Sequence, residues 1–390
     1  MNIGFFSDTY HPDINGVVPS IRILEKKFKE QGHNLYIITS SKHEKTEDVK
    51  DIIMLSSLPL VFQPSYRLST FYSVKDMKRI KELDLDIIHT HSEFSLGIFG
   101  LIAARELRIP VIHTFHTKWE DYLHYVTPRF ISNREYAKKV TRQALRMFFK
   151  RCDCVIAPTA AMEQYIRDKC NIRTKPISVI PSAINLQPFH RENYTAEELN
   201  ELKDEFNIRE KKVLLTIGRI AKEKNIDITI KYLPRIFKEN PDAVMLIIGD
   251  GPELSNLKKL ASDLSISDKV IFAGKKPWEM IGKYYNIGDV FINSSTSETQ
   301  GLTYIEAMAA GVPIVVKKAD NLTGMVTDGE NGYIFNQNSE IVDKVNYVLK
   351  NEPSVKKIII NGLTTSEQYS PDVFASRILS LYNQAIDRFV

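Results

Sequence analysis

Short apolar runs alternate with helical patterns from one end of the chain to the other. The runs are rich in Val, Ile, Leu and Phe and are bounded by turn residues, which is typical of buried β-strands. Strands that alternate with helices favour parallel sheets in an α/β fold. The predicted strands are residues 2–7, 34–39, 52–55, 86–90, 111–115, 153–157, 177–180, 213–218, 244–249, 270–273, 290–293, 314–316 and 333–335.

One polar, charged stretch, residues 188–209, interrupts this alternation and contains no apolar run. We place a domain boundary there, because linkers lie where few apolar contacts cross. The pattern thus predicts two similar Rossmann-like domains that face each other across a cleft, an N-terminal one over residues 1–187 and a C-terminal one over 188–373. A long helix follows Pro371, where apolar residues recur at helical spacing up to the end of the chain.

Composition supports two domains and argues against a disulfide-stabilised secreted protein and against a protein that spans a membrane. A chain of 390 residues is long enough for two or three domains. Residues 1–185 hold 27 Lys and Arg against 20 Asp and Glu, so the excess positive charge lies in the N-terminal half. The three cysteines, Cys152, Cys154 and Cys170, form no disulfide pattern and suit the core of a protein in a reducing cytoplasm. The start of the chain does not resemble a signal peptide, and no apolar run reaches the ~20 residues of a membrane span, so we expect any membrane contact to be peripheral.

The stretch from residue 293 to 313 carries the clearest candidate chemistry. It follows a predicted strand and places Glu298 and Glu306 eight positions apart, with a helix predicted to begin near Leu302. The amides of Gly301 and Leu302 would then lie at a helix N-terminus, which attracts anions. Open α/β sheets bind ligands at this edge, where the strands end.

Three other loops offer groups for a phosphate. Arg219 and Lys224 follow the strand at 213–218 and could clamp a diphosphate, although ordinary solvated charges would fit this position equally well. Gly249 and Gly16 each lie in a turn where a bare amide could approach a ligand. Neither glycine belongs to a G-x-G-x-x-G motif, which argues against a nicotinamide enzyme.

Histidines cluster between the predicted strands at 86–90 and 111–115 and just after them. Their spacing could in principle ligate zinc, but supporting carboxylates are not evident, and neutral hydrogen-bonding histidines would suit the same strand ends. We therefore favour a site without metal. The clustered residues are His89, His91, His113, His116 and His124.

Residues 134–151 predict an amphipathic helix with an unusual row of like charges. Such a row costs helix stability unless a partner neutralises it, and anionic lipid head groups would be such a partner. A solvated face on a core-packed helix is the alternative, and both interpretations stay open. The apolar face comprises Tyr136, Val140, Ala144, Met147 and Phe148. The candidate membrane-binding residues are Lys138, Lys139, Arg142, Arg146, Lys150 and Arg151.

Together these motifs resemble the retaining glycosyltransferases of family 4, which have the two-domain GT-B fold with a C-terminal helix that crosses back to the N-terminal domain. The E-x7-E spacing from Glu298 to Glu306, in which Glu306 begins the run Glu-Ala-Met-Ala-Ala-Gly, is the specific part. The resemblance also covers Asn15-Gly16-Val17, Phe115-His116-Thr117, Gly218-Arg219 with Lys224, and Gly249-Asp250-Gly251.

The resemblance implies a role for each of these residues. Glu306 would hold the nucleotide ribose, and Glu298 with the amides of Gly301 and Leu302 would hold the donor sugar and its phosphate. Arg219 and Lys224 would neutralise the diphosphate, which the Gly16–Val17 turn would touch from the other domain. His116 would lie over the donor sugar, and no metal would be needed.

Around Gln300 the sequence looks most like the bacterial diacylglycerol α-glucosyltransferases, since many other family members have Phe at this position. That likeness implies transfer of glucose from UDP-glucose to diacylglycerol by a cytoplasmic enzyme bound peripherally to the inner face of the cell membrane. No nucleic-acid partner is implied. Two alternatives stay open: another acceptor, such as phosphatidylinositol or a cell-wall or polysaccharide precursor, and a non-catalytic binding module.

Overall fold

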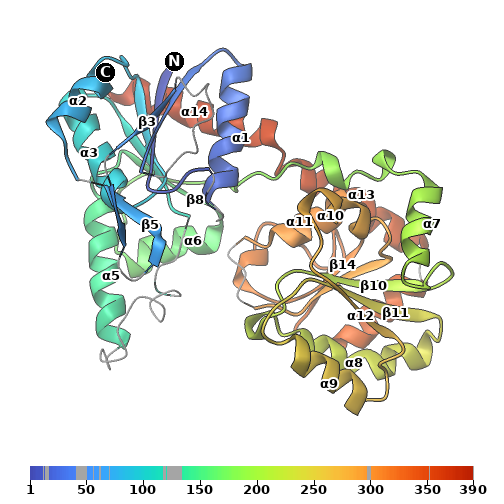
Figure 1. Ribbon diagram of the computed structural model, residues 1–390. Coiled ribbons are helices and arrows are strands. Elements are labelled where there is room, and N and C mark those ends of the chain that lie inside the picture. The colour runs from blue at the N-terminus through green and yellow to red at the C-terminus, as the bar shows by residue number, and fades with distance from the viewer. Residues whose placement is uncertain are drawn as a thin grey trace. The chain divides into compact units, whose positions relative to one another are not determined.

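A computed structural model describes residues 1–11, 13, 17–40, 51–55, 57–60, 63–69, 71–116, 120, 134–296, 300–350 and 352–389. The chain forms two compact units, one of Met1–Ile184 with Pro371–Val390 and one of Asn185–Ser370 (Figure 1). Each unit is built around its own parallel sheet, which confirms the predicted α/β class.

The first unit contains a seven-stranded parallel sheet in the order β3-β2-β1-β6-β7-β8-β9. Its strands are β1 (Asn2–Ser7), β2 (Asn34–Thr39), β3 (Ile52–Met54), β6 (Ile87–Thr90), β7 (Val111–Thr114), β8 (Cys154–Ala157) and β9 (Ile177–Val179). Its helices are α1 (Val17–Glu30), α2 (Val74–Lys81), α3 (Ser95–Leu107), α5 (Arg134–Phe149), α6 (Ala160–Gln164) and α14 (Pro371–Phe389).

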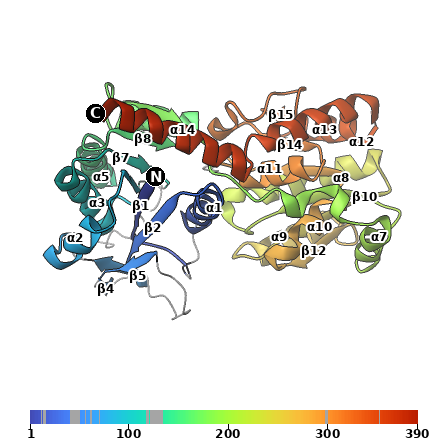
Figure 2. The same ribbon diagram turned by 90° about the horizontal axis from the view of Figure 1, so that it is seen from above.

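Helices bury both faces of this sheet, which explains why its strands are apolar throughout. Side chains alternate between the faces, so Phe5 and Phe6 of β1 belong to different cores. The Phe5 core is completed by α1 and by Phe374, Ile378 and Tyr382 of α14 (Figures 1 and 2). The last helix therefore returns to the first unit, as the resemblance implied.

A two-stranded antiparallel ribbon, which the sequence did not predict, also belongs to the first unit. It pairs β4 (Ser57–Leu60) with β5 (Gln63–Ser69). Each strand contains a proline, Pro59 or Pro64. Proline cannot donate to a strand ladder, so these segments do not have the sequence of central strands.

The second unit contains a six-stranded parallel sheet in the order β12-β11-β10-β13-β14-β15. Its strands are β10 (Lys212–Ile217), β11 (Ala243–Ile248), β12 (Val270–Gly274), β13 (Val290–Asn293), β14 (Ile314–Lys317) and β15 (Tyr333–Phe335). Its helices are α7 (Ala196–Asp204), α8 (Ile226–Glu239), α9 (Leu254–Asp263), α10 (Trp278–Tyr285), α11 (Leu302–Ala309), α12 (Glu340–Lys350) and α13 (Glu352–Glu367). All the strands predicted from apolar runs are present in the two sheets, with ends shifted by at most one residue.

The polar stretch at 188–209 contains a helix rather than only a linker. Thr195 and Glu198 form a capping box at the start of α7, in which each side chain accepts a hydrogen bond from the backbone amide of the other residue. Leu199 and Leu202 are buried, so α7 is anchored to the second unit.

Candidate active site

Four loops of the second unit leave the same edge of its sheet. The strands β11, β10, β13 and β14 are neighbours and parallel, so their carboxyl ends lie next to one another. Gly249 follows β11, Arg219 follows β10, Gly301 ends the loop after β13, and a short turn, Asp320–Leu322, follows β14. The sheet therefore brings together four loops that are far apart in the sequence.

Two of these loops contact each other through their backbones. Gly218 and Gly249 have φ angles of +149° and +145°, which side chains rarely adopt. A Cβ atom at Gly249 would lie 1.8 Å from the carbonyl oxygen of Gly218. The amide of Ile220 also donates to the carbonyl of Asp250 at 2.9 Å. Gly249 is thus required for close packing of the loops, whatever it contacts in a ligand.

The predicted diphosphate cations lie beside this contact. Arg219 is exposed and forms an ion pair with Glu223, four positions along the chain. Lys224 ends the single 3-10 turn Lys222–Lys224, directly before α8. Exposed ion pairs contribute little to stability, so the Arg219 guanidinium can exchange Glu223 for another anion at small cost.

Glu306 is a buried carboxyl on α11, with 5 % of its surface exposed. Its Oε2 accepts a hydrogen bond of 2.7 Å from the hydroxyl of Tyr285, at the end of α10. Burial raises the pKa of Glu306 to about 7. The carboxyl is therefore held in place, and its charge is poised near neutral pH.

The start of α11 has the geometry of an anion site. Gly301 is the N-cap residue, with φ +75° and ψ +47°, and among the residues that the structure describes no side chain caps the helix. Uncapped amides and the helix dipole favour a negative group here. Glu298 and Gly16, predicted to act with these amides, lie outside the described residues, as does His124.

In the first unit, strand ends bring the predicted histidines into a buried network. His89 bonds through Nδ1 to the hydroxyl of Tyr382 at 2.6 Å and through Nε2 to that of Thr114 at 2.7 Å. His91 Nδ1 lies 3.1 Å from His116 Nε2. Burial is the main cause that lowers the pKa of His116 to about 3 and that of His91 well below its usual value. His116 is therefore a neutral imidazole, suited to hydrogen bonding.

The remaining histidine of the network, His113, lies 2.8 Å from Thr90 Oγ1 and 3.2 Å from a carboxylate oxygen of Glu93. Within the described ranges, no group of three His, Cys, Asp or Glu side chains is arranged to hold a metal ion. Most ring nitrogens of the network contact hydroxyl, imidazole or carboxylate partners instead, whereas His91 Nε2 has no hydrogen-bond partner in the described part of the chain.

Helix α5 differs from its prediction in that Phe148 does not share the face of the other predicted apolar residues. Tyr136, Val140 and Met147 are 65 %, 51 % and 51 % exposed, whereas Phe148 is buried, so these residues do not form one core-facing surface. Leu145 and Phe149 form the buried stripe together with Phe148. The exposed residues 136, 140, 144 and 147 instead form an apolar stripe on the outer surface of the helix.

The predicted row of like charges on α5 is also partly neutralised. Arg142 donates to both oxygens of the buried Glu120, at 2.5 and 2.8 Å, and Tyr165 donates to the same carboxylate at 2.6 Å. Lys138 pairs with Glu135 at 2.6 Å. Arg142 is therefore a structural residue in this state, because its charge holds α5 against Glu120. Among the predicted membrane-binding residues, Lys139, Lys150 and Arg151 are exposed.

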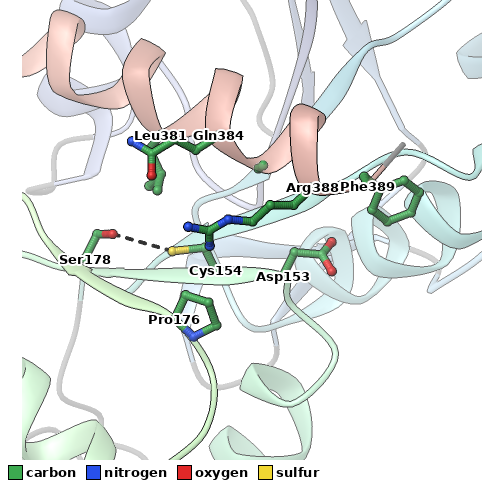
Figure 3. A pocket seen from close by; sticks show the side chains of 9 residues that line it. Asp153, Cys154, Pro176, Ser178, Leu381, Gln384, Arg388 and Phe389 are labelled. Carbon is green, nitrogen blue, oxygen red and sulfur yellow. Dashed lines mark hydrogen bonds between the residues drawn. The ribbon is translucent and has the colours of Figure 1, made fainter.

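A separate pocket in the first unit lies away from these strand ends. Asp153 and Pro176 on its wall precede β8 and β9, which places the pocket at the amino ends of the strands, and α14 contributes Arg388 (Figure 3). Cys154 also lines the pocket, and burial raises the pKa of its thiol. A protonated thiol is a weak nucleophile, so Cys154 is not suited to nucleophilic catalysis.

Solved structures with the same architecture define the class of this fold as GT-B. The Anabaena protein Alr3699/HepE, crystallised in complex with UDP, matches 98 % of this chain and 100 % of its own with a TM-score of 0.77 and 17 % identity. A sucrose-phosphate synthase from Thermosynechococcus elongatus matches with a TM-score of 0.71 over both full chains at 18 % identity.

Sequence comparison assigns the family. Residues 14–188 match the model for Glycosyltransferase Family 4, and residues 199–365 match that for Glycosyl transferases group 1. The alpha-monoglucosyldiacylglycerol synthase of Acholeplasma laidlawii is 37 % identical over 100 % of this chain and 98 % of its own. The protein of the same name from Streptococcus pneumoniae is 35 % identical over 99 % and 86 %. The chain belongs to glycosyltransferase family 4, which confirms the predicted family and fold.

Glu306 should make the stability of the protein depend on pH. Its folded-state pKa of about 7 lies above the unfolded value of 4.5, so the folded state binds the proton more tightly. The stabilisation of the folded state by protonated Glu306 is complete below pH 4.5 and is lost as the pH rises through 7. The free energy of unfolding of the wild type, measured with urea, should fall by roughly 2 to 3 kcal/mol between about pH 5 and pH 8. Glu306→Gln should remove this fall. Glu279→Gln, an exposed control on α10, should retain it; the wild-type pH dependence in Glu306→Gln would refute this burial effect.

Proposed function

We propose that this protein transfers glucose from UDP-glucose to the free hydroxyl of 1,2-diacylglycerol with retention of configuration, forming α-monoglucosyldiacylglycerol at a membrane surface. One observation carries the proposal: two relatives named alpha-monoglucosyldiacylglycerol synthase match nearly the whole chain at 37 % and 35 % identity. The fold is also that of the Anabaena protein solved in complex with UDP-glucose, a donor that suits the anion site at the sheet edge.

The donor would be held by groups from the four loops and α11. Glu306 would accept hydrogen bonds from the ribose hydroxyls, because a carboxylate is an acceptor for such donors. The amides of Gly301 and Leu302 at the helix start would bind the phosphate beside the sugar, together with Glu298 on the sugar. Arg219 and Lys224 would lie against the diphosphate, which Gly16 and Val17 of the first unit would also touch.

The chemical step breaks the bond between the anomeric carbon and the diphosphate oxygen. The acceptor hydroxyl forms the new bond on the same face, and its proton passes to the departing diphosphate. Negative charge grows on the leaving group, so fixed positive charge nearby lowers the barrier. Arg219, Lys224 and the helix-end amides would supply that charge, and a neutral His116 would contribute hydrogen bonding over the sugar without repelling the developing positive charge there.

We propose that no metal ion takes part in this step. The two basic side chains and the amides would already provide the positive charge that a divalent ion supplies to a leaving diphosphate in other transferases. Activity should consequently survive a chelator, and inhibition by the chelator would contradict this part of the proposal.

We further propose that the protein works at the inner face of the cell membrane and that α5 meets the lipid. No helix in the described part of the chain is long and apolar enough to cross a bilayer. The exposed stripe of Tyr136, Val140 and Met147 could enter the head-group region, with Lys139 and Lys150 beside it to attract anionic lipids. Diacylglycerol lies in that region, so surface binding would also bring the enzyme to its acceptor.

The direct test is incubation of the purified protein with UDP-glucose and diacylglycerol in anionic mixed micelles, with and without a chelator. The expected product is one glucosyl lipid with an α linkage, detected by chromatography and by NMR of the anomeric proton. Glucosylation of a water-soluble acceptor in place of diacylglycerol, or a β-linked product, would contradict the proposal.

Removal of the two predicted diphosphate cations should slow the chemical step more than it weakens donor binding. We expect Arg219→Ala and Lys224→Ala to lower kcat by about 100- to 1000-fold, as loss of transition-state charge stabilisation commonly does. Lys222→Ala, in the same 3-10 turn, is the matched control and should retain most activity. Glu306→Gln should instead weaken the binding of UDP, because a neutral amide accepts the ribose hydrogen bonds less well. Wild-type turnover in both cation variants would refute their role.

The exposed residues of α5 should determine vesicle binding. A triple change of Lys139, Lys150 and Arg151 to Ser should reduce cosedimentation with anionic vesicles by about 100-fold, at roughly 1 kcal/mol for each basic residue. Val140→Ser with Met147→Ser should also reduce it, through the apolar stripe. Serine at Lys259, Lys356 and Lys357 removes the same charge from exposed positions of the second unit and should have little effect. Equal losses in both triple variants would show that net charge, and not α5, governs binding.

A further inference from the structure

Asn321 is a buried amide at the same sheet edge that no part of the proposed mechanism uses. It lies in the turn Asp320–Leu322 after β14, and only 4 % of its surface is exposed. Neither its Oδ1 nor its Nδ2 atom has a hydrogen-bond partner among the residues that the structure describes.

Such an arrangement is costly. An unpaired polar group in the interior has lost its hydrogen bonds to water without replacing them, and an amide has both a donor and an acceptor to satisfy. Two other buried amides of this unit have partners: Asn240 donates to Asn346 at 2.6 Å, and Asn293 accepts from the amide of Ser295 at 2.7 Å. The two unpaired atoms of Asn321 thus indicate a ligand.

The position of Asn321 indicates which ligand that is. A Cβ atom on Gly301 would lie 2.9 Å from Asn321 Nδ2, so the amide nitrogen lies directly against the residue that starts α11. This proximity follows from the sheet, since β13 and β14 pair in parallel with Asn293 opposite Val316 and their next loops leave the same edge. Two independent features, an uncapped helix start and an unpaired buried amide, therefore meet at one place.

The hydrogen-bonding chemistry of the Asn321 side chain indicates which part of the donor it would bind. A phosphate oxygen without a proton can accept from Nδ2 but cannot donate to Oδ1, so it would leave the acceptor unpaired. A hydroxyl both donates and accepts, and a sugar with neighbouring hydroxyls can satisfy both atoms at once. We propose that Asn321 binds a hydroxyl of the transferred hexose and helps to select the sugar of the donor. This inference rests on the proposed transfer from a nucleotide sugar and adds a specificity residue to it.

The test compares wild type with Asn321→Ala on UDP-glucose, on UDP and on UDP-glucose analogues that each lack one sugar hydroxyl. For UDP-glucose, kcat/KM of the variant should fall by about 10- to 100-fold, while its affinity for UDP stays within about twofold. The wild type should lose a similar factor on the analogue that lacks the contacted hydroxyl. The variant should not lose that factor again, because the interaction is already absent.

Controls separate this contact from a structural role. Asn256→Ala, an exposed amide on α9, should behave as wild type. Thermal unfolding of Asn321→Ala should be unchanged or higher, because an unpaired buried group has been removed; if this variant is unstable, Asn321→Asp keeps the shape and changes the hydrogen bonding for the same comparison. Equal losses for UDP and UDP-glucose, or equal penalties for every analogue in wild type and variant, would overturn the proposal.

The role of Asn321 and the proposed transfer to diacylglycerol can each be wrong while the other is right. If the wild type forms no glucosyl lipid, the proposed transfer is wrong, whereas calorimetric binding of UDP-glucose and its analogues still measures the contribution of Asn321. If the wild type forms the lipid and the analogues show no coupling to Asn321, only the inference is wrong.

Discussion

Parallel pairing of β11, β10, β13 and β14 is the constraint on which the candidate site depends. Neighbouring strands that run in the same direction must end at the same edge, so loops from distant parts of the sequence meet there. The meeting is close enough to dictate residue type: the carbonyl of Gly218 occupies the space where a side chain at Gly249 would begin. Asn321 and Gly301 touch for the same reason, although twenty residues separate them. The sheet thus determines which groups can share a ligand before any of their chemistry matters.

Burial then divides the polar groups into two kinds. Desolvation raises the pKa of Glu306 and lowers that of His116, and in both cases it favours the neutral form. Such buried groups are consequently suited to hydrogen bonds with hydroxyls, whereas Arg219 presents its positive charge at the exposed surface. A donor that combines a charged diphosphate with uncharged ribose and hexose rings matches this division.

Much of the fold could be predicted from sequence because apolar runs report burial directly, and every predicted strand is present. The ribbon of β4 and β5 was not predicted, because Pro59 and Pro64 are atypical of strand sequences. Periodicity predicted an apolar face on α5 but did not indicate that Leu145, Phe148 and Phe149 form a second apolar stripe, which packs in the core. The partner of Arg142 is Glu120, and a pairing across 22 positions has no local signal. Asn321 gave no signal either, because an Asn after a strand resembles an ordinary turn residue. The roles assigned to the site residues, including Glu298 and Gly16, stay predictions.

Two buried polar side chains, Glu306 on α11 and Asn321 beside its start, differ in a way that would orient the proposed donor. Glu306 as a carboxylate can only accept, so its partners must donate, and the ribose hydroxyls do. The amides at the start of α11 can only donate, so their partner must accept, and phosphate does. Asn321 does both, which neither a phosphate nor a pure donor can satisfy. Glu306 lies in the second turn of α11, and Asn321 lies against Gly301, the N-cap residue of the same helix. Ribose, phosphate and hexose would therefore follow one another from the second turn of the helix to beyond its start. Such an order would leave the sugar beyond the helix end, beside the cations that receive the leaving group.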